Sequence, residues 1–291
     1  MSSPKFLRVP LENNMNISAL QQQFSQIGAS LAVNVVPADD RLLGGRFART
    51  RPDFVLNVRQ MDEGEYFTLT VGEPAVNQLS FLAVDVQPRD RHLLLLAKPL
   101  VSGRDKEKFL CGHDERHWFV APVPSAQSVA NVLQAKEALK PVGVAQIQRR
   151  KGVRQKDWHK RHNAGFIRQG EWFFLPEPTF QVGDSRLIWR HEPLQRPGGT
   201  PHVVEELFRI GGTAVYVAPK HPNGLTETQY RRLLAKNPSA AAWPWRVMRR
   251  NPIVYARGKI RHPDHATIEL PFWHRVLMSG EVRSNNVAFL D

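Results

Sequence analysis

The sequence predicts a mixed α+β fold, in which a β-rich N-terminal lobe built of hairpins is joined by a helix to a basic, mixed α/β C-terminal lobe. Three observations predict it. The first half contains short runs of β-branched and large apolar residues separated by turn formers. A helical segment follows between two prolines, and all of the net positive charge lies beyond it. The predicted units are a neutral lobe at residues 1–123, a connecting helix at 124–141 and a basic lobe at 142–291.

The N-terminal half is predicted to form one helix and then strands. A helix over Asn16–Ile27 is indicated by Ile17, Leu20 and Phe24 at helical spacing, with Gly28 as its stop. Strands are predicted in the runs ASLAVNVVP, DFVLNVRQ, EYFTLTVGE, FLAVDVQP and HLLLLAKPL. The segment FLCGHDERHWFVAPV is predicted to be a further hairpin with a polar tip.

The C-terminal half mixes helix and hairpin signals. The connecting helix is predicted to begin at Ser125 and to end at Pro141. The segment GTPHVVEELFRIGG predicts a helix capped by Thr200, and LTETQYRRLLAKNP predicts another with a capping box of Thr226 and Gln229. The segment IVYARGKIRHPDHATIELPFW predicts a hairpin with RHPDH at its tip.

The charge is distributed unevenly along the chain. Against 40 Lys and Arg there are 27 Asp and Glu, a formal net charge of +13. Up to Val123 the chain has 14 basic and 14 acidic residues, and the remaining 26 basic and 13 acidic residues lie beyond it. Such asymmetry indicates contact with nucleic acid or another anionic surface. The alternative is a basic protein kept soluble by its charge.

A basic run in the segment RRKGVRQKDWHKRHNAGFIRQGEWFF, residues 149–174, is the densest part of this charge. Packed cations repel one another unless an anion lies among them, and an exposed Trp158 could stack on a base. The alternative is a solvated loop. On the strand further along, Arg257, Lys259 and Arg261 alternate and should share a face, paired in part with Glu269. The predicted nucleic-acid-binding residues are Arg149, Arg150, Lys151, Arg154, Lys156, Trp158, Lys160, Arg161, Arg246, Arg249, Arg250, Arg257, Lys259 and Arg261.

The same segment ends in a tight hairpin, GFIRQGEWFF, with RQGE as its turn. Because side chains alternate along a strand, Trp172 and Phe174 should share one face and Phe173 the other. We expect Trp172 and Phe174 to be core residues rather than a platform for bases.

Histidines form a second pattern. Cys111, His113 and His117 have the spacing C-x-H-x₃-H, which is half of a zinc signature. The competing interpretation is that these are polar hairpin tips and that Cys111 points into the core. His202 could also act with Glu205 or Glu206 if all three lie on a helix. The candidate catalytic residues are His113, His117, His262 and His265, and the candidate metal ligands are Cys111, His113 and His117.

Enzyme signatures are missing from the sequence. It has no phosphate-binding loop, no dinucleotide fingerprint, no nucleophile elbow and no H-E-x₂-H motif. Whether the chain is an enzyme is therefore left undecided; if it is one, a His-based hydrolase or nuclease fits best. No cofactor is expected, although the histidines leave room for a divalent metal.

The leading functional interpretation is an intracellular protein that contacts RNA or DNA mainly through backbone phosphates. One alternative is a His-centred hydrolase acting on nucleic acid, with or without a metal. Another is an adaptor or assembly subunit whose basic face docks an acidic protein. A protein partner could bind the N-terminal lobe.

The single cysteine favours the cytoplasm. The short apolar runs argue against a membrane span, and the absence of an apolar stretch near the N-terminus argues against a signal peptide.

Overall fold

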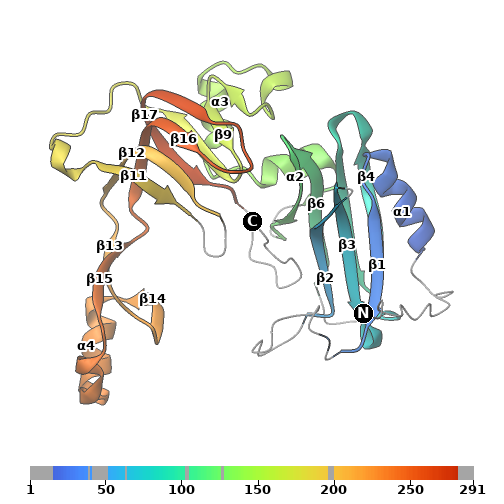
Figure 1. Ribbon diagram of the computed structural model, residues 1–291, viewed down its shortest axis with the longest axis horizontal. Helices are drawn as coiled ribbons and strands as arrows, with labels where there is room; N and C mark the ends of the chain where they lie inside the picture. Colours follow the sequence, from blue (N-terminus) through green and yellow to red (C-terminus); the bar gives the residue numbers. More distant parts are fainter. Residues whose placement is uncertain are drawn as a thin grey trace.

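The computed structural model describes residues 16–38, 40, 52–62, 64–101, 105–125, 128–195 and 200–280. Strands dominate, in four sheets, with four α-helices among these residues, so the predicted α+β class is confirmed (Figure 1). No helix in this part of the chain is both long and apolar enough to cross a bilayer. The N-terminal segment used to argue against a signal peptide, residues 1–14, lies outside the described residues. The division into a neutral and a basic lobe stays a prediction.

Two sheets form the N-terminal half, and their strands were all predicted. In the first sheet β1 pairs in parallel with β3, and β3 pairs antiparallel with β2. The second sheet is an antiparallel meander of β4, β5, β6 and β7. The elements are α1 (Ile17–Gln26), β1 (Leu31–Val36), β2 (Phe54–Met61), β3 (Gly64–Gly72), β4 (Leu79–Gln87), β5 (His92–Pro99), β6 (Glu107–Asp114) and β7 (His117–Val123).

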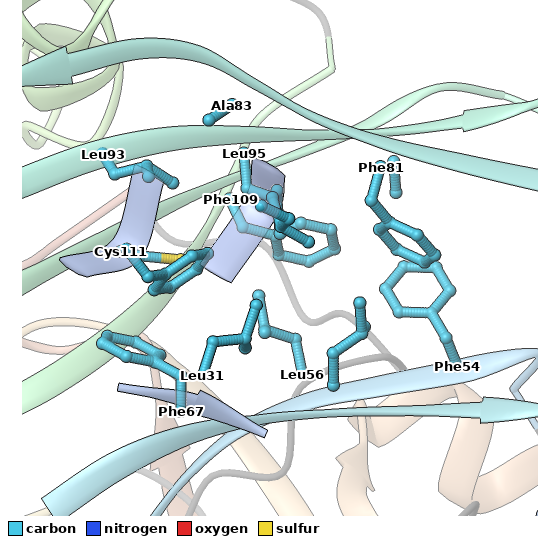
Figure 2. Packing of buried hydrophobic residues seen from close by; sticks show 14 of the residues in the cluster. Leu31, Phe54, Leu56, Phe67, Phe81, Ala83, Leu93, Leu95, Phe109 and Cys111 are labelled. Carbon is cyan, nitrogen blue, oxygen red and sulfur yellow. The ribbon is translucent and has the colours of Figure 1, made fainter. Parts of the chain in front are cut away.

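The larger hydrophobic core lies between these two sheets and is closed by α1. Figure 2 shows side chains from both sheets pointing toward one another across it. Phe54 makes edge-to-face contacts with Phe81 at 5.0 Å and with Phe109 at 5.8 Å between ring centroids. Helix α1 adds Leu20 and Phe24 to this core. Rings arranged in this way stabilise a core beyond the area that they bury.

Helix α2 (Val132–Ala138) covers the other face of the second sheet, where Val132 and Ala135 pack against Leu94 and Leu110. The helix is shorter than the predicted connecting helix and does not begin at Ser125. It begins after Asn131, whose side chain accepts a hydrogen bond from the main-chain N–H of Gln134 at 2.8 Å. Helix α3 (Val144–Arg150) follows at once.

A seven-stranded antiparallel sheet, in the order β11-β12-β16-β17-β10-β9-β8, forms the main body of the C-terminal half. Trp172 and Phe174 lie in the core on one face, and Phe173 lies on the other face under α3, as predicted. The strands are β8 (His162–Asn163), β9 (Phe166–Gln169), β10 (Trp172–Pro176), β11 (Trp189–Leu194), β12 (His202–Ile210), β16 (Ile253–Arg261) and β17 (Ile268–Met278).

The helix predicted in GTPHVVEELFRIGG is wrong, because this segment is strand β12. Its Thr and Pro resemble the start of a helix, but Val203, Val204 and Phe208 favour a pleated surface. Pairing with β11 on one side and β16 on the other satisfies the backbone of the segment, so tertiary context outweighs the local start signal.

Residues 211–252, which we call the arm, are inserted between two strands that pair directly: Ile210 faces Ile253 across β12 and β16. Figure 1 shows the arm projecting away from the seven-stranded sheet. At its base Gly212 has φ of +76°, and a Cβ there would lie 2.8 Å from the carbonyl oxygen of Arg250, so only glycine fits. The arm contains β13 (Thr213–Ala218), β14 (His221–Leu225), α4 (Glu227–Lys236) and β15 (Arg246–Arg250).

Helix α4 confirms a prediction made from the sequence. The side chain of Thr226 accepts from the main-chain N–H of Gln229, and the Gln229 side chain accepts from the main-chain N–H of Thr226. This reciprocal cap satisfies two main-chain donors that have no partner inside the helix. The sequence therefore fixes where α4 begins, even though no residue of α4 is fully buried.

Candidate functional site

The arm carries a strong excess of positive charge. Among its residues there are seven Lys and Arg and one acid, Glu227. Glu227 accepts hydrogen bonds from Arg231 at 2.8 Å and from the Tyr216 hydroxyl at 2.7 Å, so its charge is already engaged within the arm. Nearly half of the net charge of the chain is therefore on this projection. The basic residues are Lys220, Arg231, Arg232, Lys236, Arg246, Arg249 and Arg250.

Strand β15 is exposed along its whole length. Between its arginines, Val247 and Met248 are 68% and 52% exposed. In the described part of the chain no carboxylate pairs with Arg246, Arg249 or Arg250, and Arg249 donates only to the carbonyl oxygen of Gly211, at 3.3 Å. A strand that presents both unpaired guanidinium groups and apolar side chains to solvent is suited to an anionic partner.

Aromatic rings lie beside these cations. Trp243 and Trp245 are half-buried and stacked, with ring centroids 5.8 Å apart, and His221 is 5.9 Å from each. The Lys220 ammonium lies 4.5 Å from the centre of the Trp243 ring. The indole N–H of Trp245 donates to the carbonyl oxygen of Ala240 at 2.8 Å, which fixes the ring. The sequence does not show that Lys220 and His221 lie beside Trp243 and Trp245, because the two pairs meet only in the folded arm.

Several cations of the basic run are already paired with carboxylates. Asp157 binds Arg154 at 3.0 Å and Lys160 at 2.6 Å. The Arg161 guanidinium is paired with both Asp114 and Glu115, and burial lowers its pKa to about 10. The residues of the run that remain exposed without a carboxylate partner in the described structure are Arg149, which lies over the Trp158 ring, and Arg150, Lys151 and Lys156.

Trp158 does not offer an open platform. Its ring is half-buried, with the Arg149 guanidinium 5.6 Å and the Lys140 ammonium 5.5 Å from its centre. Its indole N–H donates to the carbonyl oxygen of Val153 at 2.9 Å. The predicted exposure of Trp158 is therefore wrong, because the segment folds back on itself as a short 3-10 turn rather than an extended loop.

The strand with alternating cations is partly neutralised. The Arg257 guanidinium donates to Glu206 at 2.6 Å and lies 4.8 Å from the centre of the Trp273 ring. Lys259 faces Glu269 across β16 and β17, and its main-chain N–H donates to Glu205 at 2.8 Å. These contacts leave Lys259 and Arg261 as the exposed cations of this strand.

The metal site predicted from Cys111, His113 and His117 is not formed. Cys111 is buried in the N-terminal core, as Figure 2 shows, and this burial raises the pKa of its thiol. The His113 ring contacts Trp118 at 5.0 Å between centroids, whereas Nδ1 of His117 lies 2.7 Å from Glu65 Oε1. The competing interpretation of Cys111 as a core residue is the one that the structure supports.

The two polar tips noted in the sequence meet in the structure. Glu115, at the β6–β7 tip, accepts from the main-chain N–H of Ala266 at 3.1 Å, and the same oxygen lies 3.2 Å from His265 Nδ1. His117 Nε2 lies 3.9 Å from Asp264 Oδ1. The β6–β7 tip and the β16–β17 loop, about 150 residues apart, therefore form one junction.

A cluster of three histidines, which we call the His cluster, lies at this junction: His202, His262 and His265. Their ring centroids are 4.2, 4.7 and 5.6 Å apart, and one ring nitrogen from each lies within 4.8 Å of the others. Burial first, then His262 and Arg161, lowers the pKa of His265 to about 4, so this ring is neutral near pH 7. Neutral imidazoles can accept protons or bind metal ions.

His202 reaches the cluster from the first position of β12. The suggested pairing of His202 with Glu205 or Glu206 on a helix is wrong. Glu206 instead binds Arg190 and Arg257, and Glu205 accepts from Lys259. Of the predicted catalytic histidines, the structure thus brings His262 and His265 together with His202, places His117 beside Asp264, and leaves His113 apart.

No family model, curated protein or solved structure matches the chain. The arm, the basic run and the His cluster are the features of the described structure that bear on its function.

Proposed function

We propose that the chain is a cytoplasmic protein that binds RNA or DNA mainly through backbone phosphates, with the arm as its principal contact. The observation that carries this proposal is the arm itself: a projection with seven basic residues, one acid and a stacked tryptophan pair. Cations without carboxylate partners bind phosphates by releasing condensed counterions. Aromatic faces beside them can stack on bases of any sequence.

The exposed cations of the basic run support a second contact. Figure 1 shows α3, where the run begins, and the arm at opposite ends of the seven-stranded sheet. A ligand that touches both must therefore be a long polyanion that crosses this sheet. Phosphate contacts position a protein on nucleic acid without reading its sequence. We accordingly propose sequence-tolerant binding that strengthens with the length of the ligand.

Fluorescence anisotropy with labelled single-stranded RNA, single-stranded DNA and duplexes of unrelated sequence tests this function. We expect all of them to bind at low salt with little preference for sequence. Poly-glutamate serves as the acidic competitor. The nucleic-acid proposal fails if no nucleic acid binds, or if poly-glutamate binds as tightly and a nuclease-treated pull-down still retains acidic proteins; this last result would favour an adaptor.

Replacing Arg150, Lys151 and Lys156 with glutamine should weaken binding to all sequences alike. Each lost phosphate contact should lower the slope of log K against log salt by about one unit, because one counterion fewer is released. Exposed cations contribute little to folding, so the free energy of unfolding should hardly change. Anisotropy over a salt series measures the slope.

The matched control replaces Arg89, Lys98 and Lys106, three exposed cations of the N-terminal half, with glutamine. It changes the net charge by the same amount and should leave the slope almost unchanged. If the basic-run variant also binds like the wild type, the run is a solvated loop and its assignment as an interface is wrong.

A second candidate function, hydrolysis of nucleic acid at a His-centred site, is favoured by the junction of the two tips. There Glu115 contacts His265 and Asp264 faces His117, so acid and base groups lie within reach of one another. Such pairs can catalyse general acid–base cleavage beside a 2′-hydroxyl. Incubation with labelled RNA tests this candidate: intact RNA, or equal cleavage by a His265→Ala variant, would contradict it.

A further inference from the structure

The nitrogens of the His cluster converge on one small space. Gly170, in the β9–β10 turn, has φ of +55°, and a Cβ added to it would lie 3.0 Å from His265 Nε2 and 3.4 Å from His202 Nε2. The Nε2 atoms of two histidines thus point to the place that any side chain at residue 170 would fill. His262 stacks on His202 and brings the third imidazole to within 4.8 Å.

Carboxylates lie behind two of these rings. His265 Nδ1 is 3.2 Å from Glu115 Oε2, a contact that turns its Nε2 toward the shared space. Nδ1 of His262 accepts the main-chain N–H of Asp264 at 3.1 Å, and the Asp264 carboxylate is 3.9 Å from the same atom. Coordination by His262 would therefore replace this main-chain hydrogen bond, because an Nδ1 that accepts it leaves the proton of the neutral ring on Nε2. The Glu115–His265 pair is of the kind that orients histidines that bind metals.

We propose that His202, His262 and His265 form a zinc site with an open fourth position, independently of whether the arm binds nucleic acid. Three imidazoles, here one from β12 and two from the β16–β17 loop, are ligands of the zinc type, and zinc takes them at about 2.0–2.1 Å in tetrahedral geometry. Ligand nitrogens of such a site are about 3.3 Å apart. The nitrogens lie within 4.8 Å of one another here, so coordination would require the three rings to turn closer together.

The charges around the cluster suit a divalent cation. Glu115 and Asp264 supply negative charge next to two of the rings. The nearby cations are Arg161, paired with Asp114 and Glu115, and Arg168, 3.8 Å from Asp114, so the three carboxylates Asp114, Glu115 and Asp264 outnumber the two guanidinium groups. Stacking three polar rings in a largely dry junction costs desolvation free energy, which metal coordination offsets. A bound ion would also tie the β16–β17 loop to the first residue of β12.

Zinc stoichiometry and affinity test the proposal on the full chain. After loading with zinc chloride and dialysis, elemental analysis should find one zinc per chain, and titration against a competing chelator gives the affinity. His265→Ala should lose the zinc, whereas His162→Ala, which removes an exposed histidine outside the cluster, should keep it. A wild-type chain that holds no zinc, or a His265→Ala variant that holds as much as the wild type, would overturn the site.

Two further measurements decide the matter even if His265→Ala does not fold. Cobalt loaded into the wild-type chain should give the intense visible absorption of a four-coordinate nitrogen site, which six-coordinate surface cobalt lacks. Glu115→Gln should keep one zinc per chain but bind it about 10–100-fold more weakly, since the carboxylate that supports His265 is lost. An octahedral cobalt spectrum, or unchanged affinity in Glu115→Gln, would contradict the proposed ligands.

Discussion

Replacing Trp172 with alanine is expected to lower the free energy of unfolding by about 3–5 kcal/mol. The indole is buried in the core of the seven-stranded sheet, where it packs with Phe174 and Val276. Its strand is held on both sides, by β9 and by β17, so the surrounding backbone cannot collapse freely into the space left behind. Chemical denaturation followed by circular dichroism measures the change.

Trp189→Ala is the matched control, because it removes the same side chain from β11, where the ring is 57% exposed. A surface substitution of this kind should change stability by no more than about 0.5 kcal/mol. Equal losses in the two variants would contradict the placement of Trp172 in the core. A Trp172→Ala variant that stays folded but loses affinity for nucleic acid would instead make this aromatic run a base platform.

Replacing Arg246, Arg249 and Arg250 with glutamine is expected to weaken nucleic-acid binding on the order of 100-fold near 0.1 M salt. The three side chains are exposed and have no carboxylate partner in the described structure, so no carboxylate within it competes with a phosphate for them. Because exposed charges contribute little to folding, the thermal midpoint should stay close to that of the wild type. Anisotropy at fixed salt gives the affinity.

The Arg89, Lys98 and Lys106 variant again serves as the control, since it removes three charges from another surface. The arginines could instead protect a sheet edge, and this role predicts another outcome for the same variant. Strand β15 is an edge strand, and charge on an edge prevents pairing with another chain. If the arginines only prevent pairing with another chain, the variant in which Arg246, Arg249 and Arg250 are replaced will self-associate and still bind nucleic acid as the wild type does.

Local patterns predicted the strands of the N-terminal half and the start of α4, because alternation and capping are short-range properties. They failed where pairing with distant strands determines the secondary structure of a segment. Thr200 and Pro201 resemble a helix start, yet β12 is a strand because β11 and β16 pair with it. The arm could not be predicted for the same reason: it exists because Ile210 pairs with Ile253, and the intervening residues must leave the sheet.

The site residues likewise depend on contacts between parts of the chain that are far apart in the sequence. His262 and His265 were candidate catalytic residues from the sequence, but their third partner, His202, is brought to them by the pairing of β12 with β16. Between Arg149 and Arg161 the sequence has a single acid, Asp157, so local charge counting leaves most cations of the basic run without a partner. Arg161 is neutralised by Asp114 and Glu115, which lie far away in the sequence. The class of partner that the charge counts indicate stays a prediction, and the counts alone do not tell which cations remain available to it.

The salt dependence of nucleic-acid binding tests the role of the arm most directly. For the wild type, the slope of log K against log salt should be several units, since each phosphate contact releases close to one counterion. In the Arg246, Arg249 and Arg250 variant the slope should fall by about three units, while the N-terminal control variant keeps the wild-type slope. Identical slopes in all three proteins, or binding that does not respond to salt, would show that the arm does not hold the phosphates.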